Sequence, residues 1–139
     1  MIALLDTSII LRRLFGEPRQ LSEWSKIKQG YASRLVPIEL GRVIDRYRLL
    51  GTIDDADVVH LHEQSQLALQ SLNLVALTDA ILDRAASAMP TVLGSLDAIH
   101  LATALELKRA LAPKIVVATH DAQLARAARA CGLNVVGSE

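Results

Sequence analysis

Apolar residues in this chain gather in short runs, and each run is followed by a longer segment of mixed polarity. Five short segments predict β-strands, and they are residues 2–5, 31–35, 74–77, 115–118 and 133–136. The segments 2–5 (IALL) and 115–118 (IVVA) are apolar at every position, so both faces of these strands should be covered. That pattern is typical of a parallel sheet that lies between two layers of helices.

The segments between these strands have helical spacing and recognisable ends. Helices are predicted from Asp6 to about Leu14, at 20–28, at 38–50, from Asp54 or Asp55 onwards, from Thr78 or Asp79 to before Pro90, at 95–111, and from His120 or Asp121 to Gly132. Gly51 and Gly132 suit the position just after a helix, where a left-handed backbone is common. Pro37 suits a first helical turn, and Pro113 stops the helix before it.

Strands and helices therefore alternate along the chain. This order predicts an α/β fold, in which a central, mostly parallel sheet of four to five strands is flanked by helices and joined by right-handed crossovers. The chain has 139 residues and contains neither a linker nor an internal repeat. We therefore expect one domain over residues 1–139.

Composition narrows the classes of function. The formal net charge is zero, which argues against tight, non-specific binding of nucleic acid but leaves room for a nuclease with local basic patches. Aromatic residues make up 3% of the chain, too few for a base-stacking platform. No apolar run approaches the roughly 18 residues of a membrane helix, no signal peptide is recognisable, and the single cysteine, Cys131, indicates core packing rather than a disulfide. We therefore expect a cytoplasmic protein.

Carboxylates occur where strands are predicted to end or helices to begin. Asp6 follows the first strand, and Asp121 follows the fourth. Glu39 is expected in the first turn of the helix after the second strand, and Asp97 near the start of the last long helix. In an open α/β sheet, functional sites lie outside the carboxyl ends of the strands. We therefore expect these four side chains at one end of the sheet.

Each acid alone has a structural explanation, because Asp or Glu in a first helical turn caps free N–H groups and contributes about 0.3–1 kcal/mol. A cluster is harder to explain in that way. Two carboxylates about 4 Å apart repel by about 4 kcal/mol at an effective dielectric of about 20, which exceeds the benefit of a cap. Such a cluster needs protons or a cation, and its oxygen ligands suit Mg²⁺ or Mn²⁺.

Four stretches of the chain resemble, in order, the motifs of the PIN-domain family. They are LLDTSII around Asp6, PIELGRV around Glu39, SLDAIHLATALEL around Asp97 and ATHDAQLARAARACGLNVV around Asp121. The resemblance covers essentially the whole chain in length and motif order, and it extends to the small single-domain VapC toxins of prokaryotic toxin–antitoxin pairs. It implies a PIN-like ribonuclease domain.

The resemblance implies an endoribonuclease that depends on Mg²⁺ or Mn²⁺ and leaves 5′-phosphate and 3′-hydroxyl ends. Position by position, the catalytic acids that it implies are Asp6, Glu39, Asp97 and Asp121. Of these, Asp6 and Asp97 would hold the metal, while Ser8 and Thr119 match supporting hydroxyl positions.

The resemblance also implies partners. They are a VapB-type antitoxin, an RNA substrate among tRNA, rRNA or other transcripts, and a second copy of the chain in a homodimer. In the resembling toxins the early helices form a groove for the antitoxin tail. Here the groove would be lined by Leu11, Leu14, Trp24 and Ile27.

Some polar residues allow more than one interpretation. His100 is expected to make a hydrogen bond in the core rather than to act in catalysis, and His120 is a candidate for substrate contact. Arg42 and Arg46 either contact RNA phosphates or pair with nearby acids on the same helix.

Two other functions fit part of the pattern. One is a phosphoryl-transfer domain with Asp6 as the acceptor, although phosphatases of that kind have a second Asp where Ser8 stands here. The other is an interaction module without enzymatic activity, and the intact set of acids speaks against it.

Overall fold

The computed structural model describes residues 1–111 and 114–138, and its centre is a five-stranded sheet. The strands are β1 (Ile2–Leu5), β2 (Gln29–Ser33), β3 (Asn73–Val75), β4 (Val116–Ala118) and β5 (Asn134–Val136). They lie in the order β3-β2-β1-β4-β5, and every neighbouring pair is parallel. The predicted α/β fold is confirmed, with a sheet that is parallel throughout.

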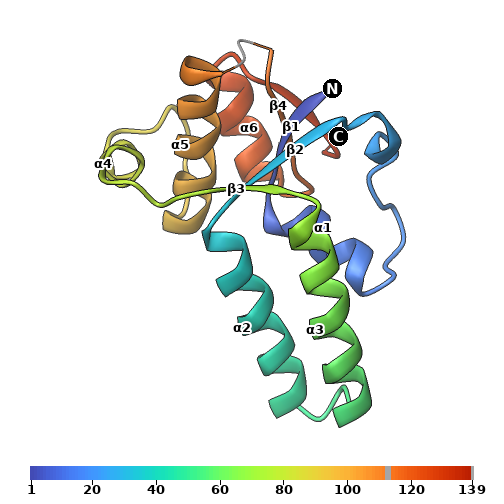
Figure 1. Ribbon diagram of the computed structural model, residues 1–139. Coiled ribbons are helices and arrows are strands. Elements are labelled where there is room, and N and C mark those ends of the chain that lie inside the picture. Colours follow the sequence, from blue (N-terminus) through green and yellow to red (C-terminus); the bar gives the residue numbers. More distant parts are fainter. Residues whose placement is uncertain (112–113, 139) are drawn as a thin grey trace.

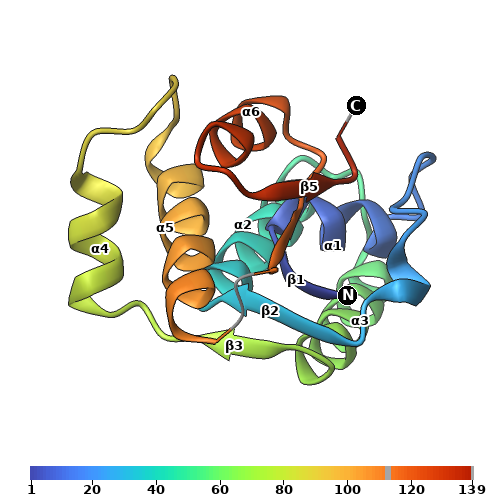
Figure 2. The same ribbon diagram turned by 90° about the horizontal axis from the view of Figure 1, so that it is seen from above.

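Helices cover the sheet and extend beyond it. They are α1 (Thr7–Leu14), α2 (Leu35–Leu49), α3 (Asp55–Gln70), α4 (Asp79–Ala86), α5 (Ser95–Ala110) and α6 (Ala122–Ala130), with a short 3₁₀ turn, η1, at Trp24–Lys26. Figure 1 shows α2 and α3 projecting together below the sheet, while α4 packs outside α5. Figure 2, from above, shows α5 and α6 on one side of the sheet and α1 on the other. Pro113, predicted to stop the helix before it, lies outside the described residues.

Most predicted element ends are confirmed by the local backbone. Asp54 begins α3 with a capping box, and Thr78 begins α4 by accepting a hydrogen bond from the Ile81 amide. Gly51 and Gly132 follow α2 and α6 with φ of 72° and 76°, the left-handed conformation that glycine tolerates.

The predicted helix at 20–28 is wrong, because only η1 forms there. Leu21, Trp24 and Ile27 recur every three residues, which suits a 3₁₀ turn, and they pack on a cluster that contains residues of β1 and α1. Arg19, just before them, has φ of 58°, which no helix can contain. Tertiary packing rather than helical propensity therefore shapes this segment.

The second strand and the helix after it both begin earlier than predicted. β2 ends at Ser33, and the Ser33 hydroxyl accepts a hydrogen bond from the Leu35 amide at the start of α2. Pro37 still lies in the first turn of α2, where its missing N–H is not needed. The shift moves Glu39 out of that first turn, with consequences for the site.

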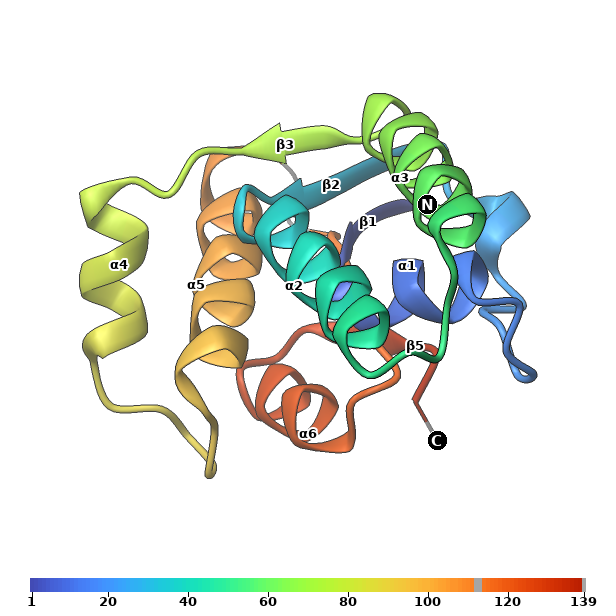
Figure 3. The same cartoon turned by 90° about the horizontal axis from the view of Figure 1, so that it is seen from below.

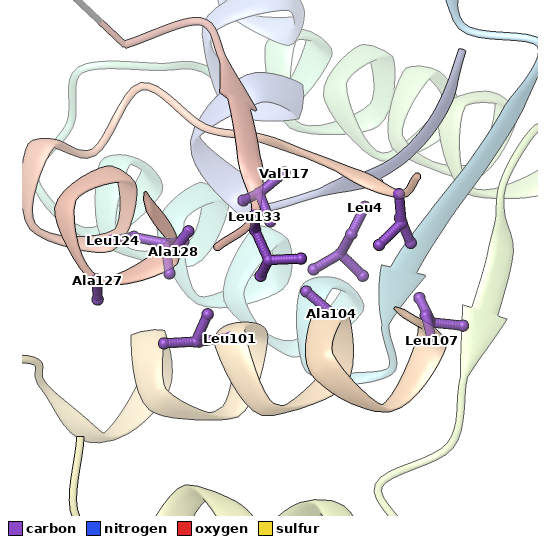
Figure 4. Close-up of a cluster of buried hydrophobic side chains, with 10 residues drawn as sticks. Leu4, Leu101, Ala104, Leu107, Val117, Leu124, Ala127, Ala128 and Leu133 are labelled. Atoms are coloured by element: carbon purple, nitrogen blue, oxygen red, sulfur yellow. The ribbon is translucent and has the colours of Figure 1, made fainter. Parts of the chain in front are cut away.

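Both faces of the central strands are buried, as the apolar runs predict. Successive residues of β1 point to opposite faces, so that Leu4 joins one cluster while Ala3 and Leu5 join another. In the first cluster, Leu101 and Ala104 of α5 pack with Leu124 and other residues of α6 against the sheet (Figure 4). The small alanine side chains of α6 let this helix approach the sheet closely. No helix in the described part of the chain is long and apolar enough to cross a membrane.

Candidate active site

The candidate site lies at the carboxyl ends of β1 and β4, two neighbouring strands at the centre of the sheet. From β1 the chain proceeds to β2 on one side, whereas β4 and β5 occupy the other side. A ligand site is expected at such a switch point of a parallel sheet. Figure 3, from below, shows α1, α2, α5 and α6 arranged around this end of the strands.

Asp6 is both the cap of a helix and a member of the site. Its Oδ1 accepts hydrogen bonds from the Ser8 hydroxyl at 2.5 Å and from the Ile9 amide at 3.4 Å. Its Oδ2 accepts a hydrogen bond from the Thr119 hydroxyl at 2.7 Å, across to the end of β4. Only 3% of the residue is exposed, and this burial raises the pKa of the carboxyl in spite of the hydrogen bonds.

The segment after β4 is tied to the segment after β1 by further hydrogen bonds. The Thr119 hydroxyl accepts from the Asp121 amide at 2.9 Å while it donates to Asp6. The His120 amide donates to the Ser8 hydroxyl at 2.9 Å. Ser8 and Thr119, predicted as supporting residues, therefore join the ends of two strands around one carboxylate.

Asp121 caps α6 at the same end of the sheet. Its Oδ1 accepts a hydrogen bond from the Leu124 amide at 2.9 Å, so one oxygen is engaged in the cap. Asp121 is half-buried at the beginning of α6.

Glu39 lies in the second turn of α2, not in the first turn as predicted, because α2 begins at Leu35. Its Oε1 accepts two hydrogen bonds, from the Thr7 hydroxyl and from Nε2 of His100, each at 2.7 Å. Partial burial raises the pKa of Glu39, but the hydrogen bonds and the charge of His100 outweigh it, and the net pKa is lowered. Glu39 is therefore ionised at neutral pH, and its Oε2 carries neither of these bonds.

His100 lies in the interior of α5 and is 1% exposed. Its hydrogen bond to Glu39 agrees with the predicted core role. Burial lowers the pKa of the imidazole, but the hydrogen bond and the negative charges of Glu39, Asp6 and Asp97 raise it overall. His100 thus supplies positive charge behind the acids.

Asp97 is the acid whose pKa responds most clearly to the other carboxylates. It lies in the first turn of α5 and is half-buried. Its pKa is raised to about 6, first by burial and then by the negative charges of Asp121, Asp6 and Glu39, with His100 acting in the opposite direction. Carboxylates from four separate parts of the chain therefore act on one another electrostatically, as the sequence predicts.

The donor set suits a hard divalent cation in its chemistry. Carboxylate and hydroxyl oxygens are the ligands that Mg²⁺ and Mn²⁺ prefer, and the raised pKa of Asp97 reflects negative charge that a cation would neutralise. In the described residues, no three Asp, Glu, His or Cys side chains are already placed to hold a metal ion. Asp6 and Asp121 direct oxygens to hydroxyl or amide donors.

Thr7 is a site residue that the sequence analysis did not identify. It is 5% exposed and donates to Glu39, which lies 32 positions away in the sequence. The only signal in the sequence was a hydroxyl residue directly after Asp6, which equally suits the start of a helix.

Several other polar residues lie outside the site. Arg42 forms an ion pair with Asp45 at 3.3 Å, which is one of the two roles that the sequence allows for it. His60 and His62 are exposed on α3. Trp24 packs under the guanidinium of Arg13, with 4.3 Å between the guanidinium carbon and the ring centroid.

A groove of about 550 Å³ lies between α1, η1 and α3. Leu14 and Trp24 line it, as predicted, together with Ile10 of α1 and Ala68 of α3. Leu11 and Ile27 are not among its lining residues. Both are partly buried and pack against hydrophobic clusters.

Comparisons with known proteins agree with this fold. The PIN-domain family model matches residues 3–130. Ribonuclease VapC47 of Mycobacterium tuberculosis (strain CDC 1551 / Oshkosh) is 32% identical over 135 residues, which span 92% of this chain and 90% of that protein.

Three solved structures have the same fold. FitAcB from Neisseria gonorrhoeae has a TM-score of 0.73 at 19% identity, and the match covers 96% of each of the two chains. A toxin–antitoxin complex from Klebsiella pneumoniae has a TM-score of 0.66 at 21% identity, over 96% of this chain and 95% of that one. VapBC2 from Rickettsia felis, bound to a DNA fragment from its promoter, has a TM-score of 0.65 at 14% identity over 97% of each chain. With its parallel sheet, its cluster of acids and these matches, the chain belongs to the PIN-domain family and is related to its VapC-type ribonucleases.

Proposed function

We propose that this chain is a cytoplasmic endoribonuclease toxin that depends on Mg²⁺ or Mn²⁺ and is inhibited by a VapB-type antitoxin. The observation that carries the proposal is the pKa of Asp97, raised to about 6 by burial and by three other carboxylates. A structural cap needs no such accumulation of charge, whereas a cation site does. Family membership supports the same conclusion, because the curated relative is named a ribonuclease.

In this proposal, Asp6 and Asp97 hold the cation. When bound, it supplies Lewis acidity that polarises a phosphate oxygen and acidifies a water molecule. Ser8 and Thr119 orient the Asp6 carboxylate through their hydroxyl hydrogen bonds. The rigid strand behind Asp6 helps to keep that carboxylate in place.

Glu39 and Asp121 complete the proposed set of catalytic acids. Glu39 is kept ionised by Thr7 and His100, so it can accept a hydrogen bond from the attacking water or bind a second cation. Asp121 keeps one oxygen in the cap of α6, and the other oxygen is available for the same tasks. The products would be a 5′-phosphate and a 3′-hydroxyl.

The proposed protein partner is an antitoxin that occupies the groove between α1 and α3. This groove has apolar walls at Leu14 and Trp24 and one exposed guanidinium, Arg13, at its surface. An antitoxin segment with apolar and acidic side chains fits such a lining. The proposed substrate is tRNA, rRNA or another transcript, and the active form would be a homodimer.

The direct test is cleavage of RNA by the purified protein, free of antitoxin. We expect cleavage with Mg²⁺ or Mn²⁺ and none with EDTA. Asp97→Asn and Asp6→Asn should each lower the rate by at least a hundredfold, on the order of the effect of losing a key electrostatic group. Asp83→Asn, which removes an exposed acid from α4, is the matched control and should cleave at the wild-type rate.

Cleavage that survives EDTA, or that survives both Asp6→Asn and Asp97→Asn, would exclude the metal mechanism. A second measurement addresses an interaction module without activity. Expression of the wild-type chain should arrest growth, whereas Asp97→Asn should not. If the two behave alike, the enzymatic proposal fails.

Asp6 is poorly suited to act as a phosphoryl acceptor. Both of its oxygens accept hydrogen bonds, and the residue is 3% exposed. A phosphorylated aspartate needs room for a tetrahedral group at one of these oxygens. Labelling of Asp6 with acetyl phosphate would revive that alternative.

A further inference from the structure

A second cavity, of about 580 Å³, lies at the carboxyl end of β5. We call it the β5 pocket, and its lining includes Arg12, Arg19, Glu23, His120, Gly137 and Ser138. The loop after α1 forms one wall, and the segment after β5 forms another. Figure 2 shows both segments at the same side of the molecule, next to α1.

One residue, His120, links the lining of the β5 pocket to the candidate active site. This residue lies between Thr119 and Asp121, and its amide donates to the Ser8 hydroxyl, which in turn donates to Asp6. The imidazole Nδ1 donates to the Gly137 carbonyl at 2.7 Å, which holds the ring in the wall of the pocket. The lining of the pocket therefore includes a residue that directly precedes Asp121 in the chain.

The β5 pocket offers arginines, in contrast to the acids of the candidate site. Arg12 and Arg19 line it together with Glu23, and the Glu17 carboxylate, which is not among the lining residues, lies 3.7 Å from Arg12. A nucleic-acid chain carries a phosphate at every nucleotide, and a nuclease with an acidic centre needs cationic groups for the phosphates on either side.

The Arg12 side chain is held by a backbone carbonyl and by a carboxylate. Arg12 donates from Nη1 to the carbonyl of Arg19 at 3.2 Å, and its Nε lies 3.7 Å from the Glu17 carboxylate. Arg19 itself has φ of 58°, and it is the one non-glycine residue with positive φ in the described part of the chain. Such a conformation is unfavourable for a residue with a Cβ, and outliers of this kind occur often at binding sites.

We propose that the β5 pocket binds a backbone phosphate of the RNA next to the bond that is cleaved, with Arg12 and Arg19 as its ligands. This inference rests on the proposed ribonuclease function and adds a substrate-positioning role for two residues that no acid motif includes. Arginine suits this role because its planar guanidinium can donate two hydrogen bonds to one phosphate.

The test measures binding rather than cleavage. The probe is a labelled single-stranded oligouridylate, with bulk tRNA in a second arm, and the protein carries Asp97→Asn so that the RNA stays intact. Affinity is measured over a series of KCl concentrations. Arg12→Gln and Arg19→Gln should each weaken binding roughly threefold or more at low salt, and each should reduce the slope of log K against log[salt] by about 0.7 for single strands.

Three variants separate binding from folding. Arg84→Gln removes the same charge from an exposed position on α4 and should leave the affinity and the slope unchanged. Arg12→Lys keeps the charge and should keep most of the slope. Arg19→Gly removes the side chain and relieves the positive φ, so its Tm should not fall although its binding weakens.

The subsite is refuted if both arginine-to-glutamine variants keep the wild-type slope, or if Arg84→Gln changes the slope equally. It is also refuted if the parent protein shows no salt-dependent binding of either RNA. Cleavage by the wild-type chain is assayed separately. A reduced slope without any cleavage would support the phosphate subsite and refute the ribonuclease proposal. Cleavage with unchanged slopes would support the ribonuclease proposal and refute the phosphate subsite.

Discussion

At the scale of single residues, the site depends on how hydroxyl and imidazole groups hold the carboxylates. Asp6 and Glu39 are both engaged by neighbours, but with opposite results, because burial dominates the pKa of Asp6 while hydrogen bonds dominate that of Glu39. Within the described part of the chain no such donor bonds to Asp97, and burial and like charges raise its pKa to about 6. The acids therefore differ in pKa although they share one site.

Asp97 should make the metal-free protein less stable as the pH rises. Its folded pKa of about 6 lies above the ordinary value of 3.8 for aspartate, so the folded state binds more protons than the unfolded state between these values. The free energy of unfolding therefore falls as the pH rises through this window. In EDTA, Asp97→Asn should be more stable than the wild type by about 1 kcal/mol at about pH 8, after allowance for solvent screening, and by less at about pH 4.

Urea unfolding of both proteins at the two pH values measures this difference. Asp83→Asn on α4 is the control and should follow the wild type at both values. An Asp97→Asn variant that is less stable than the wild type at about pH 8 would contradict the electrostatic account of the cluster.

Thr7→Val should lower activity more than stability explains. The change removes one of the two hydrogen bonds that keep Glu39 ionised, so the pKa of Glu39 should rise and the acid limb of the pH–rate profile should move upward. The loss of the bond costs about 1 kcal/mol of stability. Urea unfolding and the rate of RNA cleavage against pH are the two measurements.

Thr103→Val is the matched control for Thr7→Val. Thr103 is fully buried, and its hydroxyl donates to the Ile99 carbonyl within α5, away from Glu39. It should lose similar stability and keep the wild-type pH profile. Equal profiles for the two variants would show that Thr7 has only a structural role.

At the scale of elements, the ends of strands and helices were predictable where a local residue determines them. Strand 2–5 and the helix end at Leu14 follow directly from apolar runs and from the residues that flank them. The helix predicted at 20–28 was wrong. Leu21, Trp24 and Ile27 bury more apolar surface by packing against β1 and α1 than they would in a continued helix. Local propensity is a weak guide where burial decides.

Gly137 links the last strand to the active site. It has φ of 89°, and a Cβ added there would lie 2.8 Å from the Thr119 carbonyl oxygen and 3.2 Å from carbons of Ile9 and Leu21. Gly137→Ala should therefore displace the residues after β5 and the Thr119 hydroxyl together. We expect a loss of about 2 kcal/mol or more in stability, and reduced RNA cleavage.

Gly132→Ala is the control for Gly137→Ala. Gly132 has a similar φ of 76°, but the nearest atom to its added Cβ is the flexible Lys108 Nζ at 3.9 Å. Its cost should be limited to the backbone term of about 1 kcal/mol. Equal stability and equal activity in the two variants would mean that the contact with Thr119 has no effect on the site.

At the scale of the whole molecule, the switch point between β1 and β4 brings together acids that are far apart in the sequence. Asp6 and Thr119, 113 positions apart, share a hydrogen bond, and Glu39 and His100, 61 positions apart, share another. The acids thus lie directly after β1, at the start of α6, within α2 and within α5. A cation bound by Asp6 and Asp97 would connect the end of β1 with α5.

Mg²⁺ or Mn²⁺ should therefore stabilise the folded chain. A ligand that binds only the native state adds about 1.4 kcal/mol at ten times its Kd, which corresponds to a rise in Tm of roughly 4 °C for a chain of this size. EDTA should reverse the rise. Asp6→Asn and Asp97→Asn should each abolish most of it, while Asp83→Asn keeps it. An equal rise in all four proteins would indicate binding elsewhere.

The sequence by itself determined the alternation of strands and helices, the buried character of the central strands, and the positions of four acids after strands or near helix starts. These features are local, since periodicity, caps and breakers act over a few residues. Only the tertiary structure decided that Thr7 and His100 share one oxygen of Glu39, that Arg12 and Arg19 line a common pocket with His120, and that Leu11 does not line the groove. Such pairings depend on strand order and helix packing, which bring distant residues into contact and leave no periodic trace along the chain.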